Sequence, residues 1–162
     1  MDFELKQIGK HNLKTLENLF QLYIHDISKE LPWDCNENGI FETYSLQDWL
    51  KNNQNFGYFV YVQDKLAGFV MVDKEFKVLI NKNNNYNLSE IFILNNYKGN
   101  GLASSVVKKI FEMYKGNWEC RPVPKSISAQ TFWVKVFANN FPYAVTKHEW
   151  KENRFAFTFS NI

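Results

Sequence analysis

The residues best suited to chemistry lie in one turn, residues 95–101, which is composed of asparagine and glycine around a tyrosine and a lysine. Asparagine and glycine tolerate positive φ, so this turn can leave successive backbone amides pointing outward. Apolar residues at 88–94 predict a buried strand before the turn, and apolar spacing from Leu102 onward predicts a helix after it. Amides exposed between a strand and the N-terminus of a helix bind anions, most often phosphate.

Two of the known phosphate-binding motifs fit this turn poorly. A Walker loop requires a lysine and a hydroxyl residue after its second glycine, whereas Leu102 and Ala103 follow Gly101. A dinucleotide fingerprint requires an acid about 20 residues further on, within the first βα unit of a domain. Glu119 stands near that distance, but a proline-containing segment follows it and the turn lies beyond the middle of the chain.

A third motif fits the turn in order. It has a basic or amide residue, two spacers, a glycine, one spacer, and then glycine or alanine. The run Lys98-Gly99-Asn100-Gly101-Leu102-Ala103 follows this order. It resembles the coenzyme A loop of the GNAT superfamily of acyl-CoA N-acyltransferases, with Lys98 keeping the charge of the usual arginine. An ordinary turn leading into a core helix is the alternative interpretation of the same residues.

The composition indicates one globular domain over residues 1–162, with 45% hydrophobic and 17% aromatic residues. A net charge of +2 with scattered lysines argues against nucleic acid as a partner. No apolar run reaches the length of a membrane span, and the first residues have neither the basic nor the apolar region of a signal peptide. We therefore expect a cytoplasmic protein without a membrane partner.

The cysteines and histidines do not predict a metal site. Cys35 and Cys120 are isolated from each other, and the three histidines have no companions at metal-ligand spacing. Unpaired, reduced cysteines are typical of a cytosolic protein.

The hydrophobic pattern predicts the element order β-α-α-β-β-β-α-β-α-β-β. The strands are expected at 3–8, 56–63, 66–72, 88–94, 118–121, 141–146 and 154–159. The helices are expected at 13–27, at 45–50, from Leu102 to a cap at Gly116, and from a cap at Ser126 or Ser128 to Phe137. Residues 81–87 are expected to form a surface loop.

This element order is that of the GNAT fold, so the resemblance covers nearly the whole chain. Residues 126–137 resemble the family's second helix signature, although Ser126 replaces the common asparagine and Trp133 the common tyrosine. Residues 67–69 resemble part of its second and third strands. The resemblance implies an α/β fold with a mixed central sheet, which splays apart between the fourth and fifth strands.

The resemblance also implies that acetyl-CoA binds where these two strands separate. The amides expected at its pyrophosphate are those of Lys98, Gly99, Asn100, Gly101, Leu102, Ala103 and Ser104. Ile93 and Leu94 are expected to offer main-chain groups to the pantetheine arm, as an added strand would. The implied reaction is transfer of the acetyl group to a primary amine by direct attack in a ternary complex.

Acetyl transfer requires a neutral amine, a donor for the carbonyl oxygen and a proton for the leaving thiolate. Glu90 in the fourth strand is the predicted general base, because acids at this part of the strand are often catalytic in such enzymes; a pair with a neighbouring lysine is the alternative. The family's usual acid, a tyrosine, aligns with Trp133, which cannot usefully give up a proton. Tyr143 is the candidate to replace it, with a core tyrosine as the alternative, and departure of the thiolate without an acid stays open.

The segment 26–49 is acidic and aromatic, and it lies where such enzymes build the acceptor pocket. Carboxylates and aromatic faces attract cations, so Asp26, Glu30 and Trp33 are the predicted acceptor-binding residues. The predicted acceptor is a small polyamine-like or amino-sugar-like amine, and a peptide amine also stays open. A solvated acidic loop with Trp33 in the core is the alternative.

Two other functions remain open from the sequence. One is a catalytically silent acetyl-CoA-binding or regulatory module of the same fold, indicated by Trp133 in place of tyrosine. The other is an α/β binding domain without a cofactor. Edge strands near the C-terminus are compatible with a homodimer.

Overall fold

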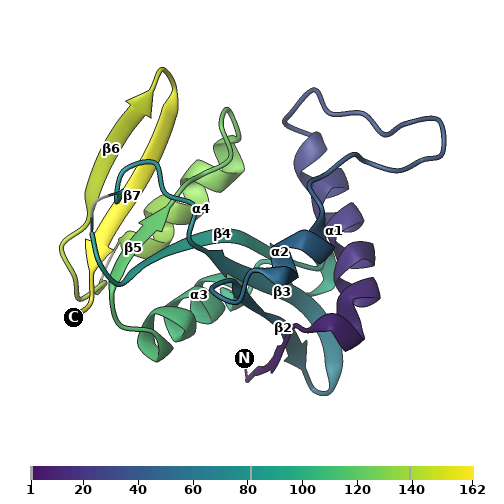
Figure 1. The fold of residues 1–162 in the computed structure, drawn as a ribbon, viewed down its shortest axis with the longest axis horizontal. Helices are drawn as coiled ribbons and strands as arrows, with labels where there is room; N and C mark the ends of the chain where they lie inside the picture. The colour runs from purple at the N-terminus through teal and green to yellow at the C-terminus, as the bar shows by residue number, and fades with distance from the viewer. Residues whose placement is uncertain (1, 81, 139) are drawn as a thin grey trace.

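The computed structural model describes residues 2–80, 82–138 and 140–162, and Figure 1 shows their fold. Among them, seven strands form one mixed sheet in the order β1-β2-β3-β4-β5-β7-β6. The strands are β1 Glu4–Gln7, β2 Phe56–Val62, β3 Lys65–Asp73, β4 Asn85–Ile93, β5 Asn117–Cys120, β6 Thr146–Lys151 and β7 Arg154–Ser160. The helices are α1 Leu13–Ser28, α2 Leu46–Lys51, α3 Leu102–Met113 and α4 Ile127–Phe137, with short 3-10 turns η1 Lys10–Asn12 and η2 Asn95–Tyr97. The predicted element order and mixed sheet are confirmed.

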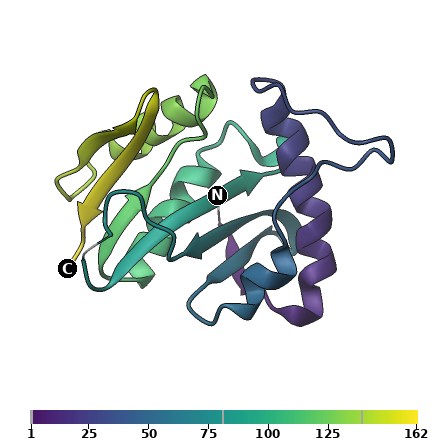
Figure 2. The same cartoon turned by 45° about the horizontal axis from the view of Figure 1, so that its top comes forward.

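The sheet splits between β4 and β5, as the resemblance implies. These two neighbours run parallel, and their pairing extends from Asn85 opposite Asn117 to Leu88 opposite Cys120. Beyond that pair β4 continues to Ile93, while the chain after Cys120 enters a proline-containing segment. A space therefore opens beside the second half of β4, and Figure 2 shows the two strands diverging.

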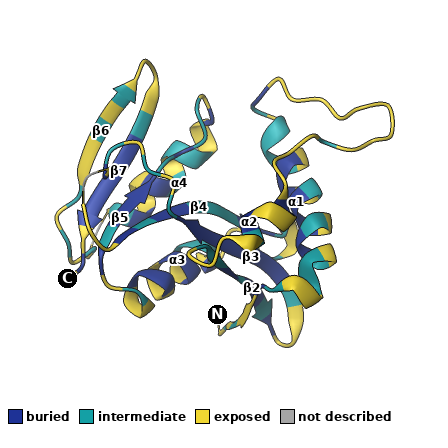
Figure 3. Cartoon of the chain, in the orientation of Figure 1, coloured by how far each residue is buried: buried dark blue, intermediate teal, exposed yellow. Residues whose placement is uncertain are grey.

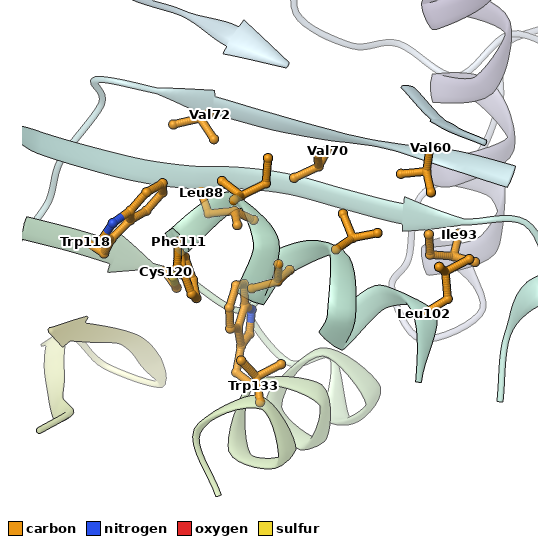
Figure 4. Packing of buried hydrophobic residues seen from close by; sticks show 14 of the residues in the cluster. Val60, Val70, Val72, Leu88, Ile93, Leu102, Phe111, Trp118, Cys120 and Trp133 are labelled. Carbon is orange, nitrogen blue, oxygen red and sulfur yellow. The ribbon is translucent and has the colours of Figure 1, made fainter. Parts of the chain in front are cut away.

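Helices cover both faces of the sheet, with α1 and α2 on one face and α3 and α4 on the other (Figure 1). Alternate residues of the central strands supply the two cores, as strand geometry requires. Phe59, Phe69 and Met71 pack with α1 and α2, whereas Val60 and Val70 pack with α3. Figure 4 shows the α3 side, where the sheet, α3 and Trp133 of α4 meet. Figure 3 shows that most residues of the central strands are buried or half-buried.

Two serines fix the starts of helices. The Ser45 hydroxyl accepts a hydrogen bond from the amide of Asp48 at 3.1 Å, and the Ser126 hydroxyl accepts one from Ala129 at 3.1 Å. Both are N-caps, because the hydroxyl satisfies an amide that has no partner within the helix. Of the two predicted caps of the last helix, Ser126 is therefore the cap.

The prediction of a surface loop at 81–87 is wrong for residues 85–87, which begin β4; residue 81 lies outside the described residues. Asn85 and Asn87 are buried. The Asn87 amide donates to Asp73 Oδ1 at 2.8 Å, and the Asn85 amide donates to the carbonyl of Leu79. Hydrogen-bond partners outside this strand thus satisfy the buried asparagine side chains. The composition of residues 81–87 alone could not show these partners.

Two predicted boundaries are also wrong. The penultimate strand was predicted at 141–146 but begins at Thr146. The prediction started too early because Phe141 and Tyr143, which pack on Phe159, have the alternating spacing of a strand. Gly116 does not cap α3, which ends at Met113. Position 116 instead requires a glycine for close packing, since a Cβ there would lie 2.4 Å from the carbonyl oxygen of Asn84.

Candidate active site

The loop before α3 has the geometry of an anion cradle. Gly99 and Gly101 adopt φ values of 85° and 75°, which side-chain-bearing residues rarely adopt. The first hydrogen bond of α3 runs from the amide of Ser105 to the carbonyl of Gly101 at 3.0 Å. The amides of the first helical turn therefore precede the helical ladder and lie at its positive end. No heavy atom lies within 4 Å of a Cβ built on either glycine, so the cradle is open.

A cleft of about 330 Å³ occupies the split between β4 and β5. Ile93, Lys98 and Ala103 of the predicted cofactor residues line it. Leu94 is less suitable than predicted, because its amide donates to Ala67 at 2.8 Å and its carbonyl accepts from Tyr97 at 2.9 Å. The cleft leads from the cradle to the middle of the sheet.

Glu90 lies on the opposite face of β4 from Leu88, because a β-bulge separates them. Leu88 pairs with Val72 and Glu90 with Met71, so Ser89 is an extra residue on β4. Without it, residues two apart would share a face. The bulge instead turns Leu88 toward α3 and Glu90 toward α1.

Two tyrosines donate hydrogen bonds to the Glu90 carboxylate. Tyr23 of α1 donates to Oε2 at 2.6 Å, and Tyr44 donates to Oε1 at 3.4 Å. Burial raises the pKa of Glu90 to about 7, although the hydrogen bond from Tyr23 opposes the rise. Burial, followed by the Glu90 charge, raises the pKa of both tyrosines, so they remain donors. Glu90 is thus poised to accept a proton near neutral pH. Nothing in the sequence beyond residue type indicated that Tyr23 and Tyr44 bind this carboxylate.

A larger cavity of about 770 Å³ lies on the α1 side of Glu90. Its walls come from α1, the segment 32–44, β4 and the β6–β7 hairpin. Figure 1 shows the segment 32–44 and the hairpin projecting beyond the same side of the sheet. Trp33 lines the cavity, as predicted for an acceptor-binding residue, and 45% of its surface is exposed.

The structure places Asp26 and Glu30 elsewhere. Asp26 forms an ion pair with Lys98 at 2.6 Å and a longer one with Lys29 at 3.6 Å. Glu30 accepts hydrogen bonds from the hydroxyls of Ser126 and Ser128 at the start of α4, and the Ser126 bond lowers its pKa. The end of α1 is thereby joined to the loop before α3 on one side of the cleft and to α4 on the other.

Tyr143 is not brought to Glu90 by the fold. Its ring stacks on Phe159 with ring centres 5.9 Å apart and contacts Phe141 edge to face. Trp133 is buried in the α3-side core, stacks on Phe137 and forms part of the cleft wall. Neither residue supplies an acid beside the carboxylate.

Arg121 lines both the cleft and the larger cavity, and its role was not predicted. Its Nη1 donates to the carbonyl of Glu75 at 2.8 Å and to the carboxylate of Glu119. Glu119 is fully buried and also accepts hydrogen bonds from the backbone amides of residues 77–79. Burial raises the pKa of Glu119, but these amide bonds outweigh it and the net shift is downward. Among the described residues, no group of three His, Cys, Asp or Glu side chains could hold a metal ion, and none of the helices is long and apolar enough to cross a membrane.

The split sheet with an amide cradle at its end is the arrangement that the GNAT resemblance implies, and a comparison with known families agrees. The model of the Acetyltransferase (GNAT) family matches residues 13–137, which is well over half of the chain. The chain therefore belongs to the GNAT acetyltransferase family. No curated protein matches its sequence.

Solved structures show the same fold. An acetyltransferase from Thermus thermophilus is 10% identical with a TM-score of 0.67, covering 98% of this chain and 96% of its own. The aminoglycoside acetyltransferase AAC(6')-Ib in complex with coenzyme A is 11% identical with a TM-score of 0.67, covering 99% and 95%. Spermidine N-acetyltransferase from Vibrio cholerae, in complex with CoA and spermine, is 13% identical with a TM-score of 0.62, covering 97% and 94%.

Proposed function

We propose that the protein transfers the acetyl group of acetyl-CoA to a primary amine by direct attack in a ternary complex. The observation that carries this proposal is the Glu90 carboxylate, which faces the larger cavity beside the cleft and has its pKa raised to about 7. A base poised near the working pH is what deprotonation of an ammonium requires. Complexes of similar structures with coenzyme A, kanamycin and spermine support an amine acceptor and this donor.

The residues present fit coenzyme A. The open loop at Gly99 and Gly101, with the amides of Leu102 to Ser104 behind it, suits a pyrophosphate. Lys98 adds a positive charge at the mouth of the cleft, where it pairs with Asp26. The free edge of β4 near Ile93 suits a pantetheine arm. When bound, acetyl-CoA supplies a thioester that an amine can attack.

The chain's own residues prepare the amine. Glu90 takes a proton from the acceptor ammonium, directly or through one water, so that the nitrogen lone pair is available. Tyr23 and Tyr44 hold the carboxylate toward the cavity through their two hydrogen bonds. The leaving sulfur needs no dedicated acid, because a thiol has a pKa far below that of an alcohol.

Calorimetric titration with acetyl-CoA tests the cofactor half of the proposal. We expect the wild-type chain to bind in the micromolar range and Gly101→Glu to lose binding, because the substitution adds a charged side chain at φ 75° inside the cradle. Met113→Glu makes the same charge change on an exposed part of α3 and serves as the control. A wild-type chain that does not bind acetyl-CoA would refute the proposal.

A catalytically silent acetyl-CoA binder is the second candidate, favoured by the buried Trp133 where the family usually has tyrosine. It predicts the same calorimetric result without release of free thiol. Thiol release in the presence of acetyl-CoA and a panel of amines separates the two: turnover that Glu90→Gln abolishes supports the enzyme, and binding without any turnover supports the silent module.

A further inference from the structure

The larger cavity carries basic as well as acidic side chains. Among the described residues that line it, the acidic ones are Asp34, Glu42 and Glu90, and the basic ones are Lys77, Arg121 and Arg154. Two of the acids belong to the segment after α1, whereas the basic residues follow β3 and β5 or begin β7. In Figure 1 the segment after α1 and the β6–β7 hairpin project beyond the same side of the sheet, over opposite ends of β4. The cavity therefore has an acidic wall and a basic wall, with Glu90 between them.

Arg121 and Glu90 line the same cavity. Cys120 is paired with Leu88 at the last rung between β4 and β5, so Arg121 and Ser89 are the first residues after that rung on their two strands. The side chains of Ser89, Glu90 and Arg121 line the larger cavity together. The positive charge of Arg121 also lowers the pKa of Glu90, against the larger effect of burial. A small ligand can thus reach both groups at once.

The Arg121 guanidinium is held in a fixed orientation. Its two bonds, to Glu75 and to buried Glu119, both use Nη1. A guanidinium has five N–H donors, so Nε and Nη2 are not used by these two bonds. The side chain is 20% exposed, at the cavity wall. A fixed planar guanidinium is the group best suited to bind a carboxylate through two parallel hydrogen bonds.

The basic wall counts against a polyamine. Lys77, Arg121 and Arg154 would repel a second or third ammonium group, and like charges brought together in a binding site reduce affinity. Asp26 and Glu30, the acids expected to attract such a ligand, are bound to Lys98 and to α4 instead. The electrostatic match is to a molecule with both signs of charge.

We propose that the acceptor is a primary amine that also carries a carboxylate, as an amino acid does, with the amine at Glu90 and the carboxylate at Arg121. This inference rests on the proposed function and names its substrate class. Lys77 and Arg154 extend the positive field around the carboxylate, and the aromatic rings of Trp33 and Trp150 enclose an apolar body. In the reaction the amine nitrogen forms a bond to the acetyl carbon and the carbon–sulfur bond breaks. The amine proton passes to Glu90, and the sulfur leaves with the electron pair and is protonated from water.

Matched acceptors test the inference by turnover. Phenylalanine, phenylalaninamide and phenethylamine share one apolar body and differ in the carboxylate, and spermidine represents the polyamines. Thiol release with acetyl-CoA gives kcat/KM for each. We expect phenylalanine to exceed the other three by about tenfold or more, the size of one charge-assisted hydrogen-bonded contact. A higher or equal value for phenethylamine or spermidine would overturn the proposal.

Variants identify the residue responsible. Arg121→Lys keeps a charge beside Glu119 but loses the planar donors, and we expect it to reduce the phenylalanine-to-phenylalaninamide ratio in kcat/KM. Arg154→Gln, on an exposed side chain, should lower the same ratio without affecting folding. Lys65→Gln removes an exposed charge at the β2–β3 turn and is the control. Unchanged ratios in both arginine variants would overturn the assignment.

A binding measurement separates this inference from the proposed function. Calorimetric titration of the CoA-saturated chain with phenylalanine and with phenethylamine requires no chemistry. Tighter binding of phenylalanine supports the inference even where no amine is acetylated, an outcome that would refute the transferase alone. Equal binding of the two, or binding of neither, overturns the inference whatever the turnover.

Discussion

Replacing Tyr23 with phenylalanine should shift the pH dependence of catalysis. The Tyr23 hydroxyl donates to Glu90 Oε2 at 2.6 Å, the shorter of the two hydrogen bonds to this carboxylate. That bond stabilises the ionised form of Glu90 and so lowers its pKa, against the larger effect of burial that brings the pKa to about 7. Tyr23→Phe removes the donor while keeping the ring that packs on Phe69 and Phe92.

The size of the shift follows from the strength of the bond. A hydrogen bond to a charged group contributes about 1.5–3 kcal/mol, and one pKa unit corresponds to about 1.4 kcal/mol. Because water entering the space left by the hydroxyl would replace part of this energy, we expect the pKa of Glu90 to rise by about one unit. The ionised base would then be scarcer below neutral pH, so activity at the acidic end should fall about tenfold.

The assay is kcat/KM from thiol release between pH 5.5 and 9, which reports the pKa of the free enzyme. The acidic limb of the Tyr23→Phe profile should lie at higher pH than that of the wild type. Tyr44→Phe, which removes the 3.4 Å contact, should move it less. Tyr58→Phe alters a tyrosine that bonds to Tyr114 instead and should leave the limb in place. A limb that stays fixed or moves to lower pH in Tyr23→Phe would refute the role of Glu90 as base.

Three further substitutions test other parts of the structure. The folded-state pKa of Glu90 is raised from 4.5 to about 7, so the fold loses stability as pH rises through that range. Glu90→Gln should therefore stabilise the fold by up to about 3 kcal/mol at pH 8 but much less at pH 5. Thermal unfolding at both pH values checks this, and an equal effect at the two would contradict it. Gly68→Ala should destabilise the β3–β4 pair by several kcal/mol, since its Cβ would lie 2.0 Å from the carbonyl oxygen of Phe92. Urea unfolding measures the effect, and Gly39→Ala, which adds a Cβ at φ 73° without a clash, shows the smaller cost of backbone strain alone. Glu119→Gln should cost about 3–5 kcal/mol by leaving Arg121 without its buried partner, and a chain as stable as wild type in urea would show that the pair has no structural role.

The sequence predicted those parts of the fold that depend on neighbours along the chain. The amide cradle was predictable because Gly99, Gly101 and the apolar spacing after them act within a single strand–loop–helix unit. The serine caps and the element order were predictable for the same reason. Each of these features is determined within a few residues of the chain.

The partners of the charged side chains were not predictable. The composition of segment 26–49 indicated that Asp26, Glu30 and Trp33 act together, but only Trp33 reaches the cavity. Asp26 pairs with Lys98, 72 residues away, and Glu30 accepts hydrogen bonds from the start of α4, 96 to 98 residues away. Such pairs arise only when the sheet has brought distant segments together. The place of Arg121 in the cavity wall was not predictable for the same reason, because the side chain is held by Glu119 and by Glu75 in the segment after β3.

The bulge at Ser89 has a consequence for how the site is encoded. It stands immediately after the last rung that joins β4 to β5, and a bulged strand bends away from its former course. The surplus residue therefore stands at the point where the cleft beside β4 opens. Deletion of Ser89 is therefore expected to leave Glu90 facing α1 while reducing the bend of β4 at the point where it leaves β5. The opening of the cleft thus depends on the number of residues between Leu88 and Glu90, which a substitution that keeps the chain length does not change.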